Sequence, residues 1–192
     1  MATPSALPLD EATYRDIRLD AARGMVTLRR PLLLDLGGVA KGLAIDLAAR
    51  ELDGLGGYTI EAGGDLYVAG RAPRGARWRI GVRHARDAHA VSDVIQLSRG
   101  AVCTSGGYAR PGAADGEHHL LDPRTGRSPR RAASATVIAP SAALADALAT
   151  AAVVLGPRRG LRLLARQGVD GLIVSPGLGR HATPGFARPR AR

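Results

Sequence analysis

The sequence predicts an α+β fold, in which a mixed, largely antiparallel sheet is flanked by helices. Short apolar runs recur at the spacing of hairpins and are bounded by Gly, Pro, Asp or Arg, which is the pattern of strands joined by turns. Only three segments show the longer Ala- and Leu-rich pattern of helices. Neighbouring parallel strands need a long crossover, usually a helix, so the scarcity of helices favours antiparallel pairing.

The first elements lie in the N-terminal quarter of the chain. Residues Arg18–Leu34 are expected to form short strands that break at Gly24 and Pro31, because both residue types interrupt strands. Residues Ala40–Leu52 follow as a helix, which ends at Gly54.

The middle of the chain supplies the strands of the sheet, each a short apolar run between turn residues. They are expected at Tyr58–Glu61, Leu66–Ala69, Trp78–Val82, Val94–Leu97, Ala101–Thr104, His118–Leu121 and Ser134–Ile138.

The strongest helix pattern begins at Ser141, whose hydroxyl can cap free backbone N–H groups, and continues to Gly156. A second helix over Arg158–Gln167 and a strand over Leu172–Ser175 complete the domain.

Length and composition indicate one domain over residues 1–179. The chain has 192 residues and 45% hydrophobic content, enough for one sizeable core. Residues 180–192 contain two prolines and four arginines and predict a basic, disordered tail.

The net charge of +10 raises the question of a nucleic-acid partner. Because the arginines are scattered and aromatic residues make up only 3% of the chain, we expect no nucleic-acid binding. The single cysteine, Cys103, allows no internal disulfide and follows apolar residues, so we expect it to be buried in a strand. No signal-peptide-like or membrane-spanning run is present. As written, the chain is expected to be soluble and cytoplasmic; an N-terminal truncation would leave an exported or periplasmic location open.

Lys41 is the single lysine among 27 basic side chains. It lies in the segment Asp35-Leu-Gly-Gly-Val-Ala-Lys-Gly42, which follows an apolar run and opens a helix. Free N–H groups at a helix N-terminus, beside a flexible ammonium group, can bind a phosphate. A surface lysine next to a tight turn explains the segment as well.

Two further Gly-Gly segments follow strands. Glu61-Ala-Gly-Gly-Asp65 allows close approach of a ligand or of another backbone, and a plain hairpin turn explains it nearly as well. Thr104-Ser-Gly-Gly-Tyr108 offers the hydroxyls of Thr104 and Ser105 at a strand end, where they either bind a ligand or close a turn.

The segment His118-His-Leu-Leu-Asp-Pro-Arg-Thr-Gly126 places two histidines on a predicted strand. His118 and His119 would then point to opposite faces, so only one of them can enter a given cleft. That histidine is a candidate general base, whereas a buried histidine is more often structural. A zinc site is not expected, because further ligands at the usual spacing are missing.

Asp146 and Thr150 are one turn apart on an Ala- and Leu-rich helix. A buried Asp needs a partner, and Mg²⁺ prefers oxygen ligands of this kind. The alternative is an Asp that faces solvent.

Taken in this order, the segments make the chain similar to the ApbE family, the FAD:protein FMN transferases. The similarity runs from about Asp35 to Gly156, through Asp-Leu-Gly-Gly-Val-Ala-Lys-Gly-Leu-Ala-Ile-Asp46, Gly-Gly-Asp65, Thr-Ser-Gly-Gly-Tyr108, His-Leu-Leu-Asp-Pro-Arg-Thr-Gly126 and Ala-Asp-Ala-Leu-Ala-Thr150.

The resemblance implies Mg²⁺-dependent transfer of FMN from FAD to a Thr or Ser hydroxyl of an acceptor flavoprotein, such as a redox-complex subunit, with release of AMP. An FAD pyrophosphatase and a non-catalytic flavin-binding remnant are the alternatives. The implied roles are as follows: Gly38, Asp146 and Thr150 bind Mg²⁺; Asp35, Lys41, Leu121, Thr104 and Ser105 bind FAD; His119 is the catalytic base.

The chain departs from the family pattern in two respects. Family members usually carry a long segment before the first Gly-Gly, which forms part of the flavin-binding wall. The chain is therefore expected to be a natural short form, a fragment, or half of a split enzyme whose wall a partner chain would supply. The family usually has an acidic residue where this chain has Gly107.

Overall fold

A six-stranded antiparallel sheet forms the centre of the protein. The computed structural model describes residues 13–87, 89–107 and 118–186. The strand order is β10-β9-β8-β7-β4-β3. The strands are β3 (Gly57–Ala62), β4 (Asp65–Gly70), β7 (Gly100–Gly106), β8 (Ser134–Ala139), β9 (Asp170–Val174) and β10 (Arg180–Ala182).

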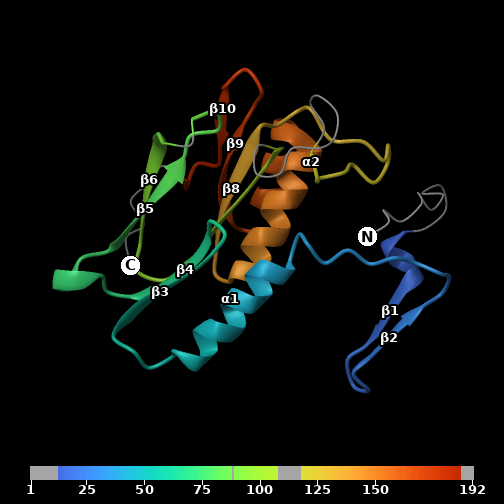
Figure 1. Ribbon diagram of the computed structural model, residues 1–192, viewed down its shortest axis with the longest axis horizontal. Coiled ribbons are helices and arrows are strands. Elements are labelled where there is room, and N and C mark those ends of the chain that lie inside the picture. The colour runs from blue at the N-terminus through green and yellow to red at the C-terminus, as the bar shows by residue number, and fades with distance from the viewer. Residues whose placement is uncertain (1–12, 88, 108–117, 187–192) are drawn as a thin grey trace.

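Helices and a second ribbon cover the two faces of this sheet (Figure 1). Helices α1 (Ala40–Glu51) and α2 (Ala142–Arg166) pack on one face. The hairpin of β5 (Trp78–Arg83) and β6 (Val91–Leu97) packs on the other. All strand ladders in the described residues are antiparallel, so the predicted α+β fold with helices flanking the sheet is confirmed.

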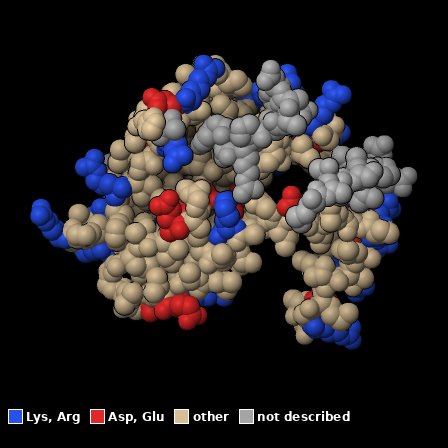
Figure 2. All heavy atoms as spheres, viewed as in Figure 1, with Lys and Arg blue, Asp and Glu red and all other residues tan. Residues whose placement is uncertain are grey.

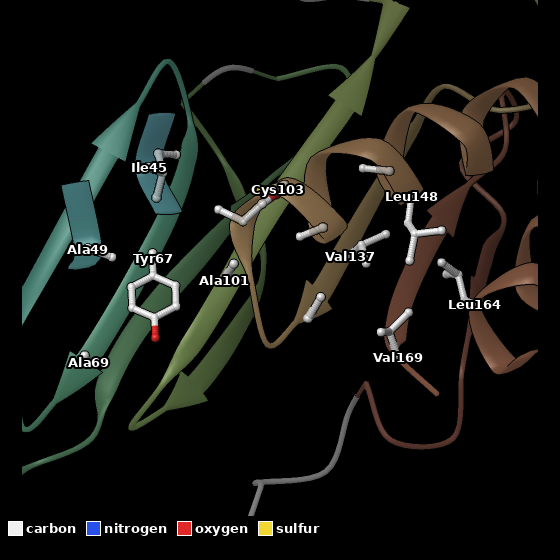
Figure 3. Close-up of a cluster of buried hydrophobic side chains, with 14 of the residues drawn as sticks. Ile45, Ala49, Tyr67, Ala69, Ala101, Cys103, Val137, Leu148, Leu164 and Val169 are labelled. Atoms are coloured by element: carbon white, nitrogen blue, oxygen red, sulfur yellow. Dashed lines mark hydrogen bonds between the residues drawn. The ribbon is translucent and has the colours of Figure 1, made fainter. Parts of the chain in front are cut away.

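Small side chains let α2 lie close to the sheet. Ala145, Ala149 and Ala152 of α2 are fully buried, as are Ala101 and Cys103 of β7. Larger side chains from the sheet and from α1 and α2 close the cluster around them (Figure 3). The predicted burial of Cys103 is confirmed, and burial also raises the pKa of its thiol.

The two predicted C-terminal helices are joined end to end in α2. Gly156 has φ 71° and ψ 178°, which breaks the helical path just before Pro157. This left-handed φ favours glycine. The predicted helix boundary at Gly156 is therefore confirmed.

The predicted strand over His118–Leu121 is wrong. The Leu120 N–H donates to His118 Nδ1 at 3.3 Å, and Asp122 forms an isolated bridge with Arg127. These local hydrogen bonds form a compact turn, which takes up backbone groups that a strand would pair with a neighbour.

The predicted disordered tail is wrong for residues 180–186. Strand β10 pairs with β9, and the Thr183 hydroxyl donates to Asp170 at 2.7 Å. Phe186 is buried in the core beneath the β5–β6 hairpin. Burial of this aromatic side chain outweighs the composition of the segment. Residues 187–192 lie outside the described part of the chain.

An N-terminal arm stands apart from the sheet and the helices (Figure 1). It consists of a short 3₁₀ turn, Tyr14–Asp16, and the hairpin of β1 (Ile17–Asp20) and β2 (Met25–Leu28). The two strands match the prediction around Gly24, whereas residues 31–34 form no strand.

The arm hairpin has one apolar face. The register pairs Ile17 with Leu28 and Leu19 with Val26, so these four side chains share a face. Leu19 is 73% exposed and Val26 is 59% exposed. Figures 1 and 2 show the hairpin away from the main body.

Within the described residues, no helix combines the length and apolar character needed to span a bilayer.

We predict that Gly42→Ala destabilises the fold. A Cβ at Gly42 would lie 2.3 Å from the carbonyl oxygen of Ala142, where α1 and α2 touch through their backbones. We expect a loss of about 1–3 kcal/mol in the free energy of unfolding, the usual range for overpacking, measured by urea denaturation. Gly56→Ala is the matched control, because a Cβ there has no neighbour within 4 Å. Equal stability of the two variants would contradict the close helix contact.

Candidate functional site

The N-termini of α1 and α2 meet, and each helix is capped by a carboxylate from the other. Asp46 of α1 accepts the backbone N–H groups of Ala142 and Ala143 at 2.7 and 2.9 Å. In return, Asp146 of α2 accepts the N–H of Gly42 at 3.1 Å. The residue before α1 provides no side-chain cap, so Asp146 takes that role. A carboxylate at a helix N-terminus is also favoured by the helix dipole.

Lys41 links this junction to the central sheet. Its Nζ lies 3.2 Å from Asp146 Oδ1 on α2 and makes a closer ion pair with Asp65 Oδ2 at the start of β4. The other Asp65 oxygen accepts the backbone N–H of Thr104 at 3.0 Å. One ammonium group therefore neutralises carboxylates from two different elements.

Both carboxylates are buried, whereas Lys41 reaches the surface. Asp65 is 1% exposed and Asp146 is 2% exposed. Burial raises the pKa of Asp65, although Lys41 and the Thr104 N–H partly oppose that effect. Burial also tends to lower the pKa of Lys41, but Asp65 and Asp146 outweigh it and raise this pKa overall. Lys41 therefore stays positively charged at neutral pH. The burial of Asp146 shows that the alternative expectation, an Asp146 that faces solvent, is wrong.

Thr150 lies one helical turn beyond Asp146 on α2, and Gly38 lies in the loop before α1. The Thr150 hydroxyl shares a 2.9 Å hydrogen bond with the Ser105 hydroxyl of β7. A Cβ at Gly38 would lie 3.5 Å from Thr150 Oγ1, so the loop before α1 runs directly against this side chain. The structure thus brings Gly38 to Thr150 and Lys41 to Asp146.

The hydroxyl of Thr104 lies on the other face of the sheet. It shares a 2.9 Å hydrogen bond with the Thr136 hydroxyl of β8. Cys103 and Val137, the neighbours of these threonines along their strands, point toward the helices. We call Lys41, Asp65 and Asp146 the Lys41 cluster. Thr104 therefore contacts this cluster only through its backbone N–H, which donates to Asp65.

Asp35 closes the turn that leads into the Gly-Gly loop. Its Oδ1 accepts the backbone N–H of Gly37 at 2.7 Å, which is the hydrogen bond of an Asx turn. This contact orients the loop that carries Gly38.

The two predicted histidines differ in their surroundings. His118 is held by its ring, because Nδ1 accepts the Leu120 N–H at 3.3 Å and Nε2 lies 3.2 Å from the Pro129 carbonyl oxygen. His119 and Leu121 are exposed, whereas Leu120 between them is buried. Of the two histidines, His118 is half-buried and His119 is exposed.

Gly107 and His118 fit each other. A Cβ at position 107 would lie 2.6 Å from His118 Cδ2. An acidic side chain at this position would therefore displace the His118 ring. A pocket of about 300 Å³ lies beside these two residues and is also lined by Pro129 and Arg130.

Sequence comparison assigns the family. The sequence profile of the ApbE family matches residues 2–173. This chain belongs to the ApbE family. The Escherichia coli K12 protein named FAD:protein FMN transferase is 36% identical over 144 residues, which is 72% of this chain and 41% of that protein.

Solved ApbE structures share the fold. The ApbE protein of Thermotoga maritima is 36% identical, with a TM-score of 0.84 over 94% of this chain and 62% of its own. The flavin transferase ApbE of Vibrio cholerae is 28% identical, with a TM-score of 0.80 over 96% of this chain and 64% of its own. This ApbE chain therefore spans less than two thirds of each of these relatives.

Two carboxylates at the ApbE site, Asp46 and Asp65, are not among the site residues that the sequence predicts. Asp65 ends the segment Glu61-Ala-Gly-Gly-Asp65, and Asp46 ends the segment that begins at Asp35. Asp46 lies on a helix rich in Ala and Leu, as Asp146 does. The same signal, a lone acid on an apolar helix, would have found it.

We predict that the turn carrying His119 weakens in acid. The Arg124 hydrogen bonds lower the pKa of Asp122 from 3.8 to about 2. The ionised carboxylate therefore stabilises the folded state above pH 3.8, and this stabilisation is lost as the pH falls toward 2. Asp122→Asn should be less stable than the parent in urea at pH 6, with a difference that shrinks on acidification. Asp53→Asn, an exposed control, should match the parent, and a pH-independent deficit in Asp122→Asn would contradict this assignment.

Proposed function

We propose that this chain carries catalytic groups of an FAD:protein FMN transferase. The reaction would move FMN from FAD to a Thr or Ser hydroxyl of an acceptor flavoprotein and release AMP. The observation that carries the proposal is the Lys41 cluster, in which one ammonium group and two buried carboxylates meet at two helix N-termini. The Lys41 ammonium group, whose side chain is 41% exposed, is the positive charge at this junction that would meet a pyrophosphate.

The oxygen groups around α2 fit a magnesium ion. Asp146, Thr150 and the backbone of Gly38 are oxygen donors on adjoining segments, and Mg²⁺ prefers a carboxylate with neutral oxygen ligands. Within the described residues, no three acidic, histidine or cysteine side chains form a metal cluster, so Asp146 would be the charged ligand. A bound Mg²⁺ would withdraw electron density from the pyrophosphate and neutralise charge on it.

The remaining residues would divide the work of binding and proton transfer. Lys41 would contact the phosphates, and the loop oriented by Asp35 would approach FAD together with Leu121. Ser105 holds the Thr150 hydroxyl in place. His119 would take the proton from the acceptor hydroxyl as its oxygen bonds to the FMN phosphorus. The bond from that phosphorus to the AMP oxygen would break, and AMP would leave.

The exposure of His119 bears on the alternative activity. An exposed base can take a proton from water as well as from a protein hydroxyl, which would give FMN and AMP without any acceptor. Purified chain with FAD, Mg²⁺ and a flavin-free acceptor flavoprotein separates the two reactions. Transfer gives a fluorescent acceptor band in a denaturing gel, and hydrolysis gives AMP without that band.

We also propose that a partner chain completes the flavin-binding wall. Two observations support this proposal. The apolar face of the arm is exposed at Leu19 and Val26, and an isolated two-stranded hairpin is only marginally stable in water. The solved Thermotoga maritima ApbE aligns with this chain over 62% of its own length.

Asp146→Asn should remove Mg²⁺-dependent release of AMP from FAD. The amide oxygen can still accept the Gly42 N–H, so α1 keeps its cap while the charged metal ligand is lost. Released AMP is measured by chromatography with and without Mg²⁺. Asp53→Asn, which changes an exposed carboxylate elsewhere, should behave as the parent. Full activity of Asp146→Asn would refute the assigned role.

His119→Ala should lower AMP release by roughly 100-fold or more, the usual contribution of a general base. Binding of Mg²⁺, measured by calorimetry, should not change, because the predicted ligands are on other segments. His181→Ala is the control, since that histidine is exposed on β10. If His119→Ala turned over at the parent rate, another group would have to be the base.

A further inference from the structure

Lys41 and a metal ion would compete for the same carboxylate oxygen. Asp146 Oδ2 is occupied by the Gly42 N–H at 3.1 Å, and Asp146 Oδ1 lies 3.2 Å from Lys41 Nζ. Any cation that binds Asp146 therefore meets the Lys41 ammonium group at Oδ1. A divalent ion at that oxygen would repel Lys41 at short range in a partly buried site.

Asp65 offers Lys41 a second acceptor within reach. Lys41 already touches Asp65 Oδ2, and the Thr104 N–H holds the other Asp65 oxygen at 3.0 Å. The Asp65 side chain is 2% exposed, whereas that of Lys41 is 41% exposed and can pivot on its flexible stem. A small turn of the stem would leave Lys41 on Asp65 alone and free Asp146 Oδ1.

We propose that Asp65 is a positioning residue for cation binding: it accepts the Lys41 ammonium group when a divalent cation takes Asp146. This inference rests on the proposed function, because it concerns the metal of that reaction. Asp65 then keeps Lys41 beside the pyrophosphate while Asp146 serves the metal. It also explains why the position carries the chain's single lysine, since a planar guanidinium fork would tend to bridge both carboxylates.

The test is the dissociation constant for Mg²⁺, measured by calorimetry on the full chain without FAD. Lys41→Met removes the competing ammonium and should bind Mg²⁺ about tenfold more tightly, within the range by which neighbours of metal ligands alter affinity. Asp65→Asn leaves Lys41 with Asp146 as its charged partner and should bind Mg²⁺ about tenfold more weakly. Arg99→Met is the matched control, because it removes one positive charge near the opposite end of β7 and should leave affinity unchanged.

The double variant separates positioning from simple charge effects. If Asp65 draws Lys41 away, Lys41→Met should tighten Mg²⁺ binding more in the Asp65→Asn background than in the parent. The double variant also removes both members of the Lys41–Asp65 ion pair, which is less destabilising than removing one of them. Thermal unfolding of each variant checks that it folds.

The outcomes distinguish this inference from the function on which it rests. Unchanged or weaker Mg²⁺ binding by Lys41→Met, with a parent that binds Mg²⁺, would overturn the inference alone. Equal effects of Lys41→Met in both backgrounds would overturn the role of Asp65. A parent chain that binds no Mg²⁺ would overturn the proposed metal site and, with it, the inference.

Discussion

The site depends on the contact between the N-termini of α1 and α2. Gly42 has no side chain, so the two backbones can touch there, and Asp46 and Asp146 each cap the opposite helix. The two helix N-termini therefore lie side by side, and each carboxylate is fixed by backbone hydrogen bonds from the opposite helix. The positions of Lys41, Gly38 and Thr150 follow from this junction, because Lys41 and Gly38 precede it on α1 and its loop, and Thr150 follows it on α2.

Burial of the carboxylates gives Lys41 its place. Asp65 and Asp146 are almost fully buried, and buried charges are costly unless they are paired. The Lys41 ammonium group satisfies both and remains partly exposed, so it can also meet a ligand from solvent. The pairing of Lys41 with Asp65 and Asp146 therefore both stabilises the fold and forms a charged site. A substitution of any of these three residues can change folding as well as binding, so the two are measured separately. On the face of the molecule drawn in Figure 2, by contrast, the basic side chains are spread over the surface.

Sequence patterns predicted the elements well, but not the contacts between them. The helices, the antiparallel sheet and the break at Gly156 follow from local periodicity and turn residues. The reciprocal caps of Asp46 and Asp146 are tertiary contacts between residues about a hundred positions apart, so no local pattern encodes them. The face of a strand residue is equally hidden: Thr104 and Ser105 look alike in sequence, yet only the Ser105 hydroxyl reaches α2.

Errors in the prediction have physical causes of the same kind. The composition of residues 180–186 indicates disorder, but one buried phenylalanine and a β10 pairing outweigh it. The segment after His118 is apolar enough for a strand, but its backbone groups bond locally within the turn at Asp122. The roles of His119, Asp146 and Thr150 in flavin transfer remain predictions from the resemblance.

The position of a bound divalent cation tests the proposed site most directly. Crystals of the chain grown with Mn²⁺, an anomalous scatterer that favours oxygen ligands as Mg²⁺ does, would locate it. We expect an anomalous peak between Asp146, Thr150 and the Gly38 backbone, with the Lys41 ammonium group on Asp65. A peak at other residues, with Lys41 still on Asp146, would contradict this expectation.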